Sequence, residues 1–218
     1  MKLQKLGGYS AIASVCFYII QILMRSRNPH AAVMDAAGVM ARFSARPAHV
    51  IVLELVFSIS SILAFVMFLA LHERMQAGAV HLTRIMLIAA SVSAAAHITA
   101  SIGLFMGGMI IVPVQDVSAF RALLAMVMSL VYLVYHTHGW ACLLLGCAVL
   151  KTRSFSGILG WLFVFIGIVQ IPTTIVPQLA RGNLIASLLS GLGTVWIGIA
   201  LLRQKQPQPA AKEMAASR

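Results

Sequence analysis

A few ionisable side chains interrupt long apolar runs in this chain, and they are the residues that could do chemistry. His136 and His138 lie in LVYHTHGWACLLLGC, His97 lies in SAAAHITAS, and Glu54 lies in VLELVFS. An ionised side chain at the centre of a bilayer costs about 2.5–3.5 kcal/mol, so such residues face the protein interior and are candidates for function. If the runs cross a membrane, these groups can bind a polar ligand, share protons or coordinate a metal.

The polar residues within the runs recur at helical spacing. Residues that are three, four or seven positions apart share one face of an α-helix, and in lipid that face must point inward. His136 and His138 are about 200° apart around a helix, so they face different neighbours. The sets are Glu54, Ser58 and Ser61; Ser93, His97 and Ser101; Ser129, Tyr132 and His136; and Tyr135, His138 and Cys142.

Counting from the basic ends of the runs places these groups at similar depths. His97 follows Arg84 by thirteen residues, which is about 20 Å at the rise of an α-helix. His138 precedes Lys151 by the same number, so the two imidazoles lie level. We therefore expect a polar pocket in the outer half of the membrane, open to the exterior. Its predicted lining is Glu54, His97, Tyr135, His136, His138, Gln21 and Gln170.

The Ser and Thr residues within the runs, Ser61 and Ser190 among them, are expected to form hydrogen bonds between helices. A structural or assembly role without a ligand is one alternative for the protein, and three kinds of site fit the predicted lining. The first binds or transports a small ligand or protons, with Glu54 as a charged anchor or proton acceptor. The second is a divalent-metal or acid–base centre of a membrane enzyme, built from Glu54, His97 and His138. The third is haem b held by His97 and His138 on antiparallel neighbouring helices. No HExxH or GxSxG motif is present, so catalytic residues and an enzymatic role stay open.

The composition requires a membrane protein. Of 218 residues, 61% are hydrophobic and 10% are charged, whereas soluble domains have about 45–50% apolar and about 25% charged residues. The net charge of +11 comes from Lys and Arg at the ends of apolar runs, where lipid head groups attract them, so no nucleic-acid partner is expected. The partner is the lipid bilayer, with a possible small-molecule ligand.

The apolar runs predict an all-α transmembrane bundle of six helices in a single domain, residues 1–202. A short interfacial helix is expected between the first two spans, and residues 203–218 form a polar tail that is expected to be disordered. Glycines such as Gly146, Gly157 and Gly160 are expected at close helix contacts. The six spans are 6–24, 49–72, 84–112, 119–150, 157–176 and 184–202, and residues 73–83 link the second to the third.

The distribution of Lys and Arg predicts the orientation. With the N-terminus inside, ten Lys and Arg lie on the inner side and six on the outer side, among them Arg42, Arg46 and Arg121. Because positive residues favour the cytoplasmic side, a multi-pass protein of the bacterial inner membrane with both termini in the cytoplasm is expected.

One segment resembles a known family. The run HGWACLLLGCAVLKTRSFSGILGWL, residues 138–162, resembles a segment of the uncharacterised bacterial membrane family described as domain of unknown function 4386. The shared pattern is a His-Gly pair near mid-span, a small-residue stretch, a short basic loop and an Ile-Leu-Gly start to the next span. The opening GGYSAIASVCFYIIQ looks similar too. The resemblance implies a six-helix architecture and brings no activity, substrate or cofactor.

Overall fold

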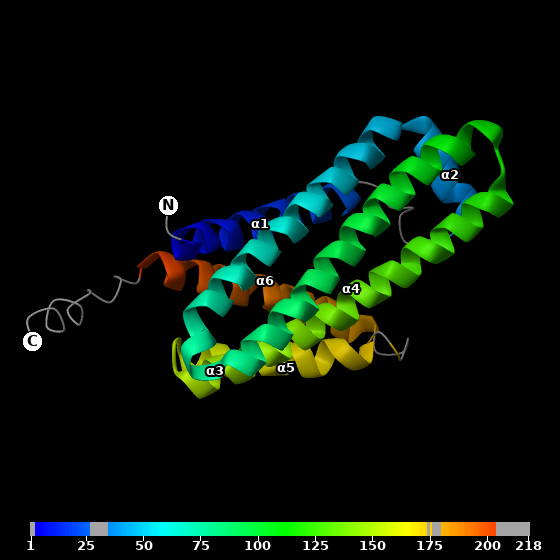
Figure 1. The fold of residues 1–218 in the computed structure, drawn as a ribbon. Coiled ribbons are helices and arrows are strands. Elements are labelled where there is room, and N and C mark those ends of the chain that lie inside the picture. Colours follow the sequence, from blue (N-terminus) through cyan, green and yellow to red (C-terminus); the bar gives the residue numbers. More distant parts are fainter. Residues whose placement is uncertain (1–2, 27–34, 174, 176–179, 204–218) are drawn as a thin grey trace, which may run out of the picture.

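The computed structural model describes residues 3–26, 35–173, 175 and 180–203. Within these residues all regular structure is helical and no strand occurs, which confirms the predicted all-α class (Figure 1). The elements are α1 (Leu3–Ser26), α2 (Ala36–Ala45), α3 (Pro47–Ile111), the 3-10 turn η2 (Val112–Val114), α4 (Val117–Thr152), α5 (Gly157–Thr173) and α6 (Ala180–Arg203).

Helix α3 is folded back on itself. Ala79 has non-helical backbone angles, φ −150° and ψ 48°, in an otherwise helical stretch. Across this break Ser101 donates a hydrogen bond to Glu54, at 2.9 Å, and Ser61 pairs with the His97 ring. Both pairs are centred close to Ala79 in the sequence, so residues 47–78 and 80–111 are two antiparallel arms. Figure 1 shows them side by side, joined at the end where α5 begins.

The link expected over residues 73–83 is therefore wrong in its extent. Helical structure continues through this segment and only Ala79 leaves the helical conformation. The physical reason is that the segment contains no proline and begins with the strong helix formers Glu73, Met75 and Gln76; Gly78, its weakest helix former, directly precedes the break at Ala79. We call this end of the molecule, around Ala79, the hinge end.

The helix lengths suit a membrane. In the part of the chain that the structure describes, four helical stretches are long and apolar enough to cross a bilayer, namely Leu3–Met24, Pro47–Val114, Val117–Thr152 and Ile185–Arg203. The apolar stretch Gly157–Pro172 of α5 is shorter. The end of the predicted fifth span and most of the predicted tail, residues 204–218, lie outside the described residues.

The distribution of side chains is that of a protein surrounded by lipid. Large apolar side chains such as Ile110, Ile158 and Leu192 are about two-thirds exposed, at 69%, 71% and 67%. Polar side chains are buried instead, including Ser14, Ser93, His97, Gln170 and Ser190. In water this arrangement would expose apolar surface at a large cost, whereas in lipid it satisfies both groups.

Helix α2 packs across the end opposite the hinge. Asp35 caps it, accepting hydrogen bonds from the backbone N–H groups of Ala37 and Gly38 at 3.2 and 3.3 Å. Met40 and Phe43 on its buried face belong to a small apolar cluster that also holds residues of η2 and α4. We call this the α2 end; Figure 1 shows α2 beside the start of α4 and the last turns of α3.

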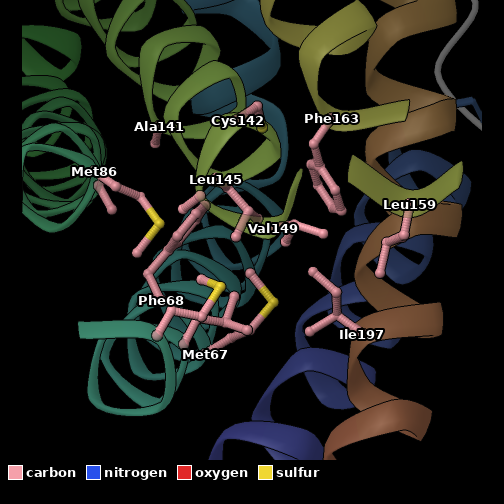
Figure 2. Packing of buried hydrophobic residues seen from close by; sticks show 14 of the residues in the cluster. Met67, Phe68, Met86, Ala141, Cys142, Leu145, Val149, Leu159, Phe163 and Ile197 are labelled. Atoms are coloured by element: carbon pink, nitrogen blue, oxygen red, sulfur yellow. The ribbon is translucent and has the colours of Figure 1, made fainter. Parts of the chain in front are cut away.

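A larger apolar cluster fills the bundle toward the hinge end. Figure 2 shows Met67 and Phe68 of α3 packed with Leu145 and Val149 of α4. The cluster continues to α5, α6 and the hinge residue Ala79 itself. Apolar side chains therefore fill the hinge end of the bundle, and Met67, Phe68 and Ala90 of this cluster also border the small cavity described below.

Glycines allow α4 and α5 to approach closely. A methyl group added at Gly146 would lie 2.6 Å from the carbonyl oxygen of Gly160 and from the backbone nitrogen of Val164. One added at Gly167 would lie 2.7 Å from the carbonyl oxygen of Gly139. The close-packing prediction therefore fits Gly146, but not Gly157, where a methyl group would meet nothing within 4 Å.

Replacing Gly146 by alanine is expected to separate α4 from α5. The added methyl group clashes with backbone rather than with a flexible side chain, so the free energy of unfolding should fall by about 1–3 kcal/mol. Thermal or dodecyl-sulfate unfolding of the purified protein measures this. The matched control is Gly157→Ala, which should leave the stability within about 0.5 kcal/mol of the original. Equal effects of the two substitutions would contradict the packing described here.

Candidate functional site

Two adjoining cavities lie between the helices. The small cavity has a volume of about 160 Å³ and the large cavity about 910 Å³. Both are lined by Phe57, His97, Val131 and Tyr135, which come from the first arm of α3, its second arm and α4. We call these four residues the neck, because the two cavities meet there.

The large cavity reaches the α2 end. Asp35, Arg46 and Arg121 line it and are exposed, whereas Ala100 and Ser101 line it and are buried. It therefore runs from the surface of the protein inward to the neck. Its polar lining consists of Asp35, Arg42, Arg46, His49, Glu54, His97, Ser101, Arg121 and Tyr135.

Glu54 lines the large cavity in the first arm of α3. Its carboxylate accepts a hydrogen bond from the Ser101 hydroxyl on the second arm, at 2.9 Å. Glu54 is half-buried, and a carboxylate in such a place needs a donor to offset the loss of water. The Ser101 hydroxyl provides one, and it ties the two arms together at the level of the cavity.

His97 occupies the neck. It is 7% exposed, its Nδ1 forms a hydrogen bond with the Ser61 hydroxyl, and the Phe57 ring lies edge-on to its face. The ring is thus held by two residues of the opposite arm of α3. Because it lines both cavities, His97 is the ionisable side chain best placed to respond to a ligand in either.

His138 lines the small cavity on α4. Its Nε2 lies 3.2 Å from the Ser190 hydroxyl on α6 and 3.4 Å from the Cys142 thiol, one turn along its own helix. The hydroxyl and the thiol can each donate or accept, so the direction of both bonds depends on which ring nitrogen of His138 carries the proton. Phe68 lies edge-on to the ring at 6.2 Å between centroids. A proton could pass between this imidazole and a hydroxyl in the cavity.

Two further predicted residues join these cavities. Gln170 lines the small cavity near the end of α5 and is 2% exposed. Tyr135 belongs to the neck. The structure thus brings Glu54, His97, Tyr135, His138 and Gln170 to one continuous pair of cavities.

Gln21 and His136, which were also predicted in the lining, line neither cavity. His136 points elsewhere because it is two residues from His138; its Nε2 accepts a hydrogen bond from the Trp140 indole at 3.3 Å. Gln21 is buried in α1 between Tyr18, which lines the small cavity, and Met24, which lines the large one.

The predicted metal trio is not assembled. In the described part of the chain, no three or more His, Cys, Asp or Glu side chains are grouped so that they could hold a metal ion. Glu54 lines the large cavity and not the small one, whereas His138 lines the small cavity and not the large one. The neck therefore lies between two of the three expected ligands.

The space around His97 and His138 also decides how well haem fits. A cavity of about 150 Å³ holds a molecule of the size of benzene. The small cavity, at about 160 Å³, is of that size, and a porphyrin is several times larger. The geometry between the two histidines therefore favours a small polar group or water over haem.

Several residues of the site were not singled out from the sequence. Arg42, Arg46 and Arg121 had been attributed to the outer side of the membrane, which gives no indication that they share a cavity. Arg42 and Arg121 are 79 positions apart, so spacing along one helix could not connect them. Ser61 and Ser190 had been expected to bond to neighbouring helices, and here they pair with the two cavity histidines.

Comparison with known proteins gives no relative to guide the assignment. No protein-family model, curated protein or solved structure matches this chain. The chemistry of the cavities must therefore be argued from their own residues.

Removing the hydroxyl of Ser101 is expected to loosen the two arms of α3. Ser101→Ala deletes the hydrogen bond to Glu54, and bonds of this kind between membrane helices contribute about 0.6 kcal/mol on average and about 1.7 kcal/mol at most. Unfolding of the purified protein should show a loss in this range. The control is Ser91→Ala, since Ser91 bonds only the carbonyl of Ile88 in its own helix. A larger loss for Ser91→Ala than for Ser101→Ala would contradict the role given to Ser101.

Proposed function

We propose that the protein is a multi-pass protein of the bacterial inner membrane that binds a small molecule in the large cavity. Six spans are then α1, the two arms of α3, α4, α5 and α6. Helix α2 lies in the interface and both termini are cytoplasmic. The resemblance to domain of unknown function 4386 fits this arrangement and stays a prediction.

The distribution of basic residues supports the orientation. Arg74, Arg84, Lys151 and Arg153 lie in or beside the turns at the hinge end. Arg74 also holds that end together, since it donates to the Ser154 carbonyl at 3.4 Å. The hinge end is therefore the cytoplasmic one by the preference of positive residues for that side, and the α2 end faces outward.

The shape of the cavities carries the functional proposal. The large cavity starts among exposed residues at the α2 end and narrows to the neck, and the apolar cluster that includes Met75 and Leu145 fills the hinge end. A cavity that is open on one side and closed on the other suits a binding site better than a continuous channel. Its volume of about 910 Å³ lies in the range of about 300–1,000 Å³ that ligand pockets occupy.

The residues of the neck suggest what binding would do. A ligand in the large cavity would contact His97, whose ring is already bonded to Ser61, and Glu54, which is bonded to Ser101. Glu54 would serve as the charged anchor or proton acceptor, and His97 as a group that shares a proton with the ligand. Transport of protons is the second candidate function. The observation that favours it is the hydrogen bond between the Ser190 hydroxyl and the His138 imidazole beyond the neck, because this pair would serve as a proton relay.

Access to the large cavity can be measured by cysteine modification. In a variant in which Cys16, Cys142 and Cys147 are alanine, a cysteine placed at Ala100 should react when an impermeant sulfonatoethyl methanethiosulfonate is added outside spheroplasts. Ala100 is buried but lines the large cavity. The control is Ala148→Cys, which is also buried but lies in the apolar cluster and should react at least about ten-fold more slowly. Similar rates at both positions would contradict an outward-opening cavity.

The orientation can be tested with reporter fusions at two tight links. Gln115 and Arg153 both adopt positive φ, 55° and 52°, in the connections before α4 and after it. Alkaline phosphatase fused after Gln115 should be active, because it reaches the periplasm, and fused after Arg153 it should be inactive. A green fluorescent protein fused after Arg153 should be fluorescent. The reverse pattern would place the termini outside.

A further inference from the structure

We propose that the ligand of the large cavity is a single-chain anionic amphiphile, with its acidic head held by arginines at the α2 end and its chain directed toward the neck. This inference rests on the proposed function, because it names the class of molecule that the large cavity takes. It is carried by the excess of positive charge at the mouth and by the apolar walls further in.

Positive groups outnumber negative ones among the described residues of the lining. The guanidinium groups of Arg42, Arg46 and Arg121 come from α2, from the residue between α2 and α3, and from the second turn of α4. They share the cavity with two carboxylates, those of Asp35 and Glu54. Arg42 and Arg46 are neighbours in the sequence, whereas Arg121 is 75 positions after Arg46, so two distant parts of the chain supply cationic side chains to one cavity.

The two carboxylates are already engaged by the protein. Asp35 accepts from two backbone N–H groups as the cap of α2, where the positive end of the helix dipole also offsets its charge. Glu54 accepts from Ser101 and lies eight residues from Arg46, about 12 Å further along α3. The mouth is therefore more positive than the interior of the cavity.

The start of α3 adds two side chains to the mouth of the cavity. α3 begins at Pro47, which has no N–H group, and the N–H groups of His49 and Val50 donate to the carbonyl oxygen of Arg46. The helix end itself therefore offers an anion few donors. Arg46 and His49 both line the cavity, so a carboxylate or phosphate head placed here would meet their side chains.

The walls beyond the mouth are apolar. Leu53, Leu104, Leu124 and Val127 line the cavity between the arginines and the neck. Phe57 of the neck follows Arg46 by eleven residues, which is a distance of about 16 Å along α3. This distance suits an acyl chain of medium length. A polar solute such as a sugar would gain nothing from contact with these apolar walls. An acyl chain would bury its apolar surface against them. The volume of about 910 Å³ leaves room for one such molecule.

A fluorescent fatty acid tests the proposal. The full chain in phosphatidylcholine nanodiscs is titrated with 11-(dansylamino)undecanoic acid, with empty nanodiscs as the blank. The methyl ester of the same probe supplies the same chain without the charge. We expect the acid to bind at least about ten-fold more tightly than the ester, because each charge-assisted hydrogen bond to a guanidinium group strengthens binding by roughly that factor. Inorganic phosphate, a head without a chain, should displace the acid much less effectively than laurate.

Matched double variants locate the charge effect. In Arg46→Gln/Arg121→Gln the dissociation constant of the acid should rise about ten-fold or more, while that of the ester stays within about two-fold. The control, Arg84→Gln/Arg153→Gln, removes two exposed arginines at the hinge end and should change neither. Thermal unfolding of both variants verifies that the fold is kept.

The outcomes separate this inference from the proposed function. If acid and ester bind alike, or if the two double variants have equal effects, the acidic class is wrong and the large cavity remains a binding site. If inorganic phosphate displaces the acid as well as laurate does, the site recognises a free anion and the amphiphile is wrong. If neither probe binds while a cysteine at Ala100 reacts from outside, the ligand class is again wrong. If that cysteine is unreactive as well, the proposed function fails with it.

Discussion

Hydrogen bonds between neighbouring helices are the interaction on which this bundle depends, because lipid offers a polar group no partner. Large apolar side chains point outward here, so apolar burial alone does not choose which faces meet. The Ser60 hydroxyl donates to the carbonyl of Ser14, which joins α3 to α1. The Ser93 hydroxyl donates to the carbonyl of Val134, which joins α3 to α4. Each bond fixes which side of its helix turns inward.

The cavities lie beside these interhelical hydrogen bonds. Toward the hinge end, Leu145, Val149 and Phe163 pack together in the apolar cluster. Nearer the neck, Ser61 bonds to His97 and Ser190 to His138, and all four side chains line the small cavity. The polar groups that join the helices thus lie beside the space between them.

The arginines at the α2 end show how one set of residues can serve two purposes. Positive side chains near the membrane surface are expected from lipid head groups alone. Here α2 turns Arg42 toward the bundle, and its cap residue Asp35 and buried Phe43 hold it in that position. The packing of α2 thus places Arg42 in the lining of a cavity rather than only at the outer surface.

The sequence by itself determined the features that depend on local period and length. Apolar runs and helix-forming residues determine the all-α class, and the helical period places His97 and Ser101 on one face and turns His136 away from His138. It also placed Glu54, Tyr135 and Gln170 among the lining residues, because each polar group in lipid must face inward.

Tertiary structure alone decided how these faces meet. Helical structure continues through the expected link, and α3 leaves the helical conformation at Ala79, directly after Gly78. The neck separates Glu54 from His138. The sequence could not show this separation, because counting residues along a helix gives the depth of a side chain in the membrane and not its lateral distance from another helix. Arg121 and Arg42 line the same cavity only because α2 packs against η2 and the start of α4. The spacing of residues along one helix predicts the direction in which their side chains point. The distances between helices arise instead from glycine contacts, apolar packing and hydrogen bonds between distant parts of the chain.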